Sequence, residues 1–138
     1  MSQQARTLLS LPIQTTGILA QYRGVTFAGA QVAVTGAKGV GVSERPTTVV
    51  GEIALVNVKG TCIAEAGAAI AVGSSLSYDA SGRVVTAGLL ALASGAVAVT
   101  SSAANGAIIT GGDLPQYIVG YALQPAAAAG DLIEIILS

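Results

Sequence analysis

The chain has 138 residues, no histidine or tryptophan, one cysteine and a formal net charge of −1. Histidine is the one side chain whose unperturbed pKa falls in the physiological range, so its absence removes the usual general base, proton shuttle and metal ligand. The six basic residues are scattered and form no stripe that would neutralise a phosphate backbone, so the composition predicts a structural or binding protein rather than an enzyme or a nucleic-acid-binding protein.

The first 16 residues predict an extended arm. Its apolar stretch runs from Leu8 to Ile13, and Pro12 both excludes a helix and holds the preceding residue extended. The stretch is too short for the core of a signal peptide, and the longest weakly polar run, residues 87–99, is shorter than the ~20 residues that cross a bilayer. We therefore expect an arm over residues 1–16, a single β domain over residues 17–138 and no membrane partner.

Short, β-branched apolar runs separated by glycines follow the arm. This pattern is typical of an all-β domain of short strands. The predicted strands are residues 21–27, 31–35, 48–59, 61–64, 76–78, 83–86, 117–123 and 132–137. Residues 87–116 are rich in Ala, Gly, Ser and Thr and predict one or two further strands with a surface loop.

Side-chain alternation predicts the faces of the strand that ends at residue 59. The better candidate for its core face consists of Ala54, Val56 and Val58. The opposite face is mixed and consists of Ile53, Leu55, Asn57 and Lys59.

Two connections carry turn chemistry. In residues 77–85, Asp79 suits the start of a tight hairpin loop, and Gly82 can take the positive φ that such a loop requires. In residues 124–131, Pro125, four alanines and Gly130 predict one short helical turn that joins two strands.

The last strand, residues 132–137, is apolar on both faces, as expected for a strand buried by the core on one side and by a partner on the other. A partner is also indicated by the charge, because six basic and seven acidic side chains cannot cover the roughly 6,500 Å² that a folded monomer of this size exposes. A surface of Ser, Thr, Gln and backbone amides is the alternative. The candidate subunit-interface residues are Leu132, Glu134 and Ile136.

Reactive groups are scarce, and no catalytic residue, metal site or cofactor is predicted. Without histidine there is no Ser-His-Asp or Cys-His system, and Cys62 alone forms neither a thiolate zinc site nor an internal disulfide. Cys62 is instead expected to be a small buried hydrophobe in a protein assembled in a reducing cell. The segment around Lys38 is glycine-rich, but no Ser or Thr follows the lysine as in a phosphate-binding loop, which favours a β-turn.

Paired carboxylates could still hydrolyse a glycoside. Their spacing gives no support for this, no tryptophan is present as a sugar platform, and no calcium-binding Asp series occurs. The carboxylates available are Glu44, Glu52, Glu65, Asp79, Asp113, Asp131 and Glu134.

Three blocks of sequence occur in a characteristic order. They are Gly24–Gln31 with Gly39–Val42 and Gly51–Gly60, then Ala66–Asp79 with Gly82–Thr86, and finally Ile118–Leu123 with Gly130–Ile135. In this order they resemble the capsid cement, or decoration, proteins of tailed bacteriophages over roughly residues 24–137. The arm and residues 87–116 are longer than in compact members of that family.

The resemblance implies a small β-barrel or tulip-like domain. Such proteins assemble as homotrimers on the outer surface of the expanded capsid, bind the major capsid protein and stabilise the head against the pressure of packaged DNA. The resemblance therefore also implies a virion component, made in the bacterial host cytoplasm, that takes no small-molecule substrate.

The arm is the candidate capsid contact. Its residues could add as a strand to an exposed edge of a capsid sheet, form an edge strand of the protein's own barrel, or remain disordered in isolation. A tail-fibre or adhesin-type β-module that binds host surfaces is the alternative function. The candidate capsid-contact residues are Leu8, Leu9, Leu11, Pro12 and Ile13.

Overall fold

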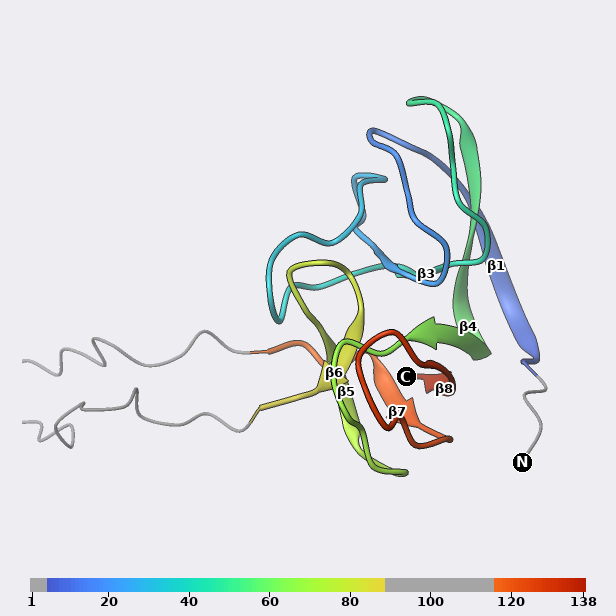
Figure 1. Ribbon diagram of the computed structural model, residues 1–138. Helices are drawn as coiled ribbons and strands as arrows, with labels where there is room; N and C mark the ends of the chain where they lie inside the picture. The colour runs from blue at the N-terminus through green and yellow to red at the C-terminus, as the bar shows by residue number, and fades with distance from the viewer. Residues whose placement is uncertain (1–4, 89–115) are drawn as a thin grey trace, which may run out of the picture.

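The computed structural model describes residues 5–88 and 116–138, and its regular elements are strands (Figure 1). No helix occurs in this part of the chain, so the prediction of an all-β domain is confirmed. The strands are β1 (Thr7–Gln14), β2 (Gly24–Val25), β3 (Gly41–Ser43), β4 (Ile53–Glu65), β5 (Ser75–Tyr78), β6 (Val84–Thr86), β7 (Gly120–Ala122) and β8 (Leu132–Leu137).

The strands form one antiparallel sheet that curls into a nearly closed barrel (Figure 1). Their order is β2-β3-β4-β8-β7-β5-β6. β6, the last strand in this order, contacts the residues that directly follow β4. Ala66 forms a bridge with Val84, and the Gly67 amide donates to the Val84 carbonyl at 2.8 Å. This contact brings β6 back beside the end of β4.

β1 lies outside this order, on the other edge of β4. Gly60 pairs with Thr7 of β1 and also with Leu137 of β8, so the two partners flank β4 at this point. β1 and the first half of β4 pair over residues 7–14 and 53–60, and we call this pair of strands the β1–β4 ribbon. β3 pairs with the same half of β4 at Val56 and Asn57.

β4 serves both parts of the molecule because it changes direction at Gly60. This glycine has φ of +98°, and a Cβ there would lie 2.5 Å from the Arg6 carbonyl oxygen. Only glycine combines this backbone conformation with so close an approach of β1. The first half of β4 can therefore hold the ribbon while the second half enters the barrel.

The core has two clusters that follow this division. The smaller lies under the ribbon and contains Leu19, Val25, Ala54 and Val56, with Ile13 and Val40 packed against it. The larger fills the barrel and contains Val32, Val42, Cys62, Ala64, Ala66, Ile70, Leu76, Tyr78, Val84, Ala122, Ala126, Ile133, Ile135 and Leu137. The predicted core face of β4 is confirmed at Ala54 and Val56, while Val58 is half-buried.

Several predicted elements are confirmed. The final strand has the predicted bounds, and β5 and β6 each differ from the predicted range by one residue at the start. β7 lies within the predicted range 117–123 but covers only Gly120–Ala122. The predicted hairpin is present, since β5 and β6 pair antiparallel and Gly82 has φ of +74°. The predicted strands 48–59 and 61–64 are joined into one strand, β4, because pairing continues through Gly60. Residues 48–52, the start of the first predicted strand, form a loop before β4, so this part of the prediction is wrong.

Two predicted strands near the N-terminus are wrong. Of residues 21–27 only Gly24–Val25 is a strand, and residues 31–35 contribute a single bridge between Gln31 and Val25. β3 was not predicted as a strand. The reason is that its three residues pair with β2 and β4, which are distant partners that leave no local periodicity.

The predicted helical turn at residues 124–131 is also wrong. Ala126 forms a bridge with Ile70, with two backbone hydrogen bonds of 2.9 and 3.0 Å. The Asp131 carboxylate accepts the amides of Ala127 and Ala128 at 2.7 and 3.1 Å. These hydrogen bonds satisfy backbone donors and acceptors of the segment without a helix. Pairing with a distant strand segment therefore outweighs the helix propensity of the alanines. The strands predicted within residues 87–116 fall almost wholly outside the described residues.

Candidate functional site

The β1–β4 ribbon has an inner face on the core and an outer face in solvent. Ile13, Ala54 and Val56 pack on the smaller core cluster, so alternation places Ile53 and Leu55 on the outer face. Their side chains are 61% and 50% exposed. Sequence analysis assigned them to the mixed face of this strand, but did not connect them with the arm.

The candidate capsid-contact residues lie on β1. Leu8 is the most exposed at 77%, Leu9, Leu11 and Pro12 are exposed, and Ile13 is half-buried against the chain's own core. Of the three conformations considered for the arm, the structure shows an edge strand of the protein's own sheet. Their contact with a capsid stays a prediction, as does the division of the chain at residue 16.

The outer edge of β1 is poorly suited to accept another strand. Thr15 donates its amide to the Glu52 carbonyl at 2.9 Å, so by alternation Ile13 and Leu11 face β4 while Gln14 and Pro12 face outward. Pro12 therefore removes a donor from the open edge without losing a bond to β4. The register also shifts twice between Thr7 and Ser10. Both features are known protections of exposed sheet edges.

A hollow of about 240 Å³ adjoins the ribbon on the far side of β4. The segment that follows β3 runs beside β4 here, with the Glu44 amide bonded to the Leu55 carbonyl at 3.2 Å. The hollow is lined by Arg45, Pro46, Thr47, Glu52, Ile53, Ala54 and Leu55.

A second apolar surface lies on the barrel. Leu132 and Ile136 of β8 are 44% and 41% exposed, whereas Glu134 is almost fully covered within the chain. Tyr121 of β7 pairs with Ile136 and is 46% exposed. The candidate interface residues therefore differ in exposure, since Leu132 and Ile136 are exposed and Glu134 is buried. Tyr121 was missed because its pairing with β8 is not visible in the sequence, and the interface role itself stays a prediction.

An exposed cation lies between two aromatic rings at the mouth of a cavity of about 180 Å³. The Lys38 ammonium is 5.6 Å from the centroid of Phe27 and 5.9 Å from that of Tyr117, within the range of cation–π attraction. The β-turn predicted around Lys38 lies just before it, over residues 34–37, where the Ala37 amide donates to the Val34 carbonyl at 3.2 Å. The rings come from distant segments, which is why the sequence did not reveal this cluster.

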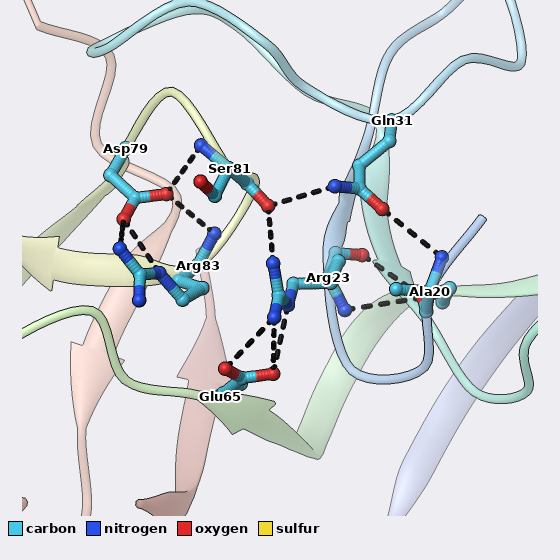
Figure 2. A network of polar contacts seen from close by, with 8 residues as sticks. Ala20, Arg23, Gln31, Glu65, Asp79, Ser81 and Arg83 are labelled. Atoms are coloured by element: carbon cyan, nitrogen blue, oxygen red, sulfur yellow. Dashed lines mark hydrogen bonds and ion pairs between the residues drawn. The ribbon is translucent and has the colours of Figure 1, made fainter. Parts of the chain in front are cut away.

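Polar side chains join the N-terminal half to the hairpin (Figure 2). Arg23 donates two hydrogen bonds to the Glu65 carboxylate, at 2.8 and 2.9 Å, and one to the Ser81 carbonyl at 2.8 Å. Gln31 donates to the same Ser81 carbonyl at 2.9 Å and accepts the Ala20 amide at 3.0 Å. This network fastens the loop before β2 to β4 and to the hairpin.

Asp79 organises the hairpin itself (Figure 2). Its carboxylate accepts the amides of Ser81 and Arg83 at 2.8 and 2.9 Å and the Arg83 side chain at 2.8 Å. Burial works to raise the pKa of Asp79, but these amides and the guanidinium hold it below its usual value. Asp79 therefore starts the turn, as predicted, and its carboxylate holds the turn by accepting these hydrogen bonds.

The Cys62 thiol and the Glu52 carboxylate lie in surroundings that give them a structural role. Burial, with a smaller effect from the Glu134 charge, raises the pKa of the Cys62 thiol to about 12, so the thiol stays protonated and poorly nucleophilic. Glu52 accepts the Thr48 amide at 3.1 Å. Within residues 5–88 and 116–138, no three His, Cys, Asp or Glu side chains gather as a metal site. The carboxylate Asp113 lies outside these ranges.

The family comparison decides between the functional interpretations. A family model described as phage cement protein matches residues 3–137. The chain belongs to the phage cement proteins. The suspected resemblance is thereby confirmed, and with it a capsid decoration role in the virion for this structural protein.

Solved structures support the fold of this cement protein. The N base of the head fiber gp8.5 of bacteriophage phi29 is similar, with a TM-score of 0.61 and 18% identity, over 94% of this chain and 93% of that chain. This likeness shows a shared fold. No curated protein matches the chain. In the part of the chain that the structure describes, no helix has the length and hydropathy of a membrane span.

Proposed function

We propose that this cement protein binds the outer surface of the expanded capsid as a homotrimer and clamps neighbouring major capsid subunits against the pressure of packaged DNA. It is made in the host cytoplasm and joins the head after assembly of the shell. The observation that carries the proposal is the family match over residues 3–137. The fold shared with a phage head fiber base is compatible with a position on the head.

Two separate apolar surfaces support an arrangement with two kinds of contact. One is the outer face of the β1–β4 ribbon, with Ile53 and Leu55 exposed, and the other is the barrel face with Tyr121 and Ile136. A trimer on a shell needs one surface for its sister subunits and another for the capsid. Exposed apolar patches on two elements of a small protein are typical of such contacts.

Weak individual contacts suffice in this arrangement. Three identical binding surfaces on one rigid trimer act at a high effective concentration once the first is bound. The low charge of the chain, 9% of residues, limits steering by long-range attraction, so shape and apolar contact supply most of the affinity.

The environments of the acidic side chains support a structural role without enzymatic activity. Glu65 and Asp79 are paired with arginines, and Glu52 and Asp131 bond backbone amides. Each of these carboxylates holds a turn or joins two segments of the chain. This structural role is a sufficient reason for each carboxylate, and no catalytic role is needed to explain it.

Co-sedimentation with purified heads tests the proposal. The protein is mixed with empty expanded heads and, as the control, with unexpanded proheads, while sedimentation equilibrium gives its mass in solution. We expect a trimer mass and saturable binding to expanded heads. A monomer that pellets with neither kind of head would overturn the proposal, and binding to host cells without binding to heads would favour the adhesin alternative.

A further inference from the structure

The outer face of the β1–β4 ribbon and the hollow beside it form one continuous surface. Ile53 and Leu55 belong to both, since they point away from the core and also line the hollow. Pro12 pairs with Leu55 across the ribbon and extends the apolar area onto β1. Farther along the ribbon the polar pair Ser10 and Asn57, whose side chains hydrogen-bond at 2.8 Å, separates this area from Leu9, which pairs with Lys59.

The rim of this surface carries unpaired cations. The ion pairs among the described residues are Arg23–Glu65 and Arg83–Asp79, so Arg45 at the hollow and Lys59 on β4 have no carboxylate partner there. Two acidic residues belong to the same region, and one of them, Glu52, itself lines the hollow. Glu52 bonds the Thr48 and Val49 amides at 3.1 and 3.4 Å, and Glu44 precedes Arg45 in an exposed position.

Contact through the face of the ribbon is favoured over pairing along its edge. Pro12 removes an outward donor from β1, and the register shifts near Leu9 distort the neighbouring part of the edge. A partner strand would therefore find an incomplete ladder. The outer face, in contrast, offers exposed side chains with a hollow beside them.

We propose that this surface is the shell-binding site, and that its occupant is an apolar protrusion of the major capsid protein with a carboxylate beside it. The protrusion fills the hollow against Ile53 and Leu55, and its carboxylate lies near Arg45. This inference rests on the proposed function and adds to it the location of the shell contact and the chemistry of the capsid surface.

Charge argues for the shell rather than a second copy as the occupant. A threefold trimer joins two different surfaces of neighbouring copies. If the ribbon surface met the barrel face around Tyr121 and Ile136, Arg45 would find no exposed carboxylate among the named residues of that face. The barrel face around Tyr121 and Ile136 has no such unpaired cation among its named residues. It is the better surface for sister subunits.

The test compares three variants of the full chain in the co-sedimentation experiment. The first is the double variant Ile53→Ser with Leu55→Ser, the second is Arg45→Glu, and the control is Val34→Ser, which changes a side chain 61% exposed on another loop. Each is also measured for thermal midpoint and for mass by sedimentation equilibrium.

The double variant should bind expanded heads about tenfold more weakly or worse, as expected for the loss of a central apolar contact. Its mass and thermal midpoint should match those of the wild type, and V34S should bind as the wild type does. R45E should also bind more weakly, and the difference from the wild type should shrink in high salt. Because Arg45 is exposed, this variant keeps the test valid even if the double variant folds poorly.

Equal binding of the double variant and the wild type would overturn the inference, as would wild-type affinity of R45E. A reduced oligomer mass in the double variant would also overturn it, because the surface would then belong to a second copy. These outcomes differ from failure of the proposed function, in which the wild type itself does not bind heads.

Discussion

The Tyr78 hydroxyl donates a hydrogen bond of 3.0 Å to the backbone carbonyl of Gly41. Tyr78 lies on β5 and Gly41 on β3, each the second strand from one end of the sheet order, so the bond joins the two end regions of the curled sheet. The ring is close to Gly39, where a Cβ would lie 2.6 Å from a ring carbon. Burial raises the pKa of Tyr78, so the phenol stays protonated and donates.

Replacement of Tyr78 by phenylalanine should remove this bond and little else. A buried carbonyl then loses its side-chain donor, and the free energy of unfolding should fall by about 1 kcal/mol. Urea denaturation measures the change, with Tyr117→Phe as the matched control because Tyr117 is 51% exposed. Equal stability of the two variants would mean that the Tyr78 bond adds nothing to the fold.

Gly82→Val should destabilise the β5–β6 hairpin. Gly82 has φ of +74°, and its Cβ would lie 3.1 Å from the Gln31 side chain, so we expect a loss of about 1 to 2 kcal/mol from the forced left-handed backbone. The control is Gly17→Val, since a Cβ at Gly17 has no neighbour within 4 Å. An unchanged thermal midpoint in the Gly82 variant would contradict the role of this glycine in the loop.

Asp79 should make the stability of the chain depend on acid pH. Its pKa is lower in the folded chain than in the unfolded chain, so the unfolded state takes up the proton first on acidification. The stability that Asp79 adds is therefore present above its unfolded pKa of about 3.9 and is lost as the pH falls through the lower folded pKa.

The variant Asp79→Ala tests this dependence. The wild type should be more stable than the variant at pH 7, and the difference in free energy of unfolding should shrink below about pH 4. Denaturant titrations at several pH values give this difference. An equal difference in free energy of unfolding between the wild type and the variant at pH 3 and pH 7 would show that the charge of Asp79 does not stabilise the hairpin.

Ile136→Lys should reduce the oligomer mass. Ile136 is 41% exposed beside Tyr121 on the barrel face, and a lysine there would put a charge into the proposed contact between sister subunits. Sedimentation equilibrium of this variant should show monomers, whereas Ile53→Lys on the ribbon should keep the wild-type mass. If Ile136→Lys sediments as the wild type does, this face is not the subunit contact.

The parts of the fold that sequence analysis found are those with local signals. The short apolar run that follows Gly130 gave the bounds of β8, and Asp79 with Gly82 gave the hairpin, because both patterns act within a few residues. The family resemblance depended on the order of blocks along nearly the whole chain, and the family match over residues 3–137 confirms it.

The parts that sequence analysis missed depend on distant pairing. β3 has only three residues, and its strand character comes from β2 and β4. The alanine segment at Ala126 looks helical by propensity, yet its backbone bonds Ile70. The ribbon surface joins Pro12 with Leu55 only through the pairing of β1 with β4. Such sites are therefore visible only after the register of the sheet is known.

The most direct test of the capsid role is a reconstruction by cryo-electron microscopy of empty expanded heads incubated with the purified protein. The account predicts density for one trimer at each local threefold position on the outer surface, with the β1–β4 ribbon against the shell. Heads that carry no added density at saturating protein would contradict it.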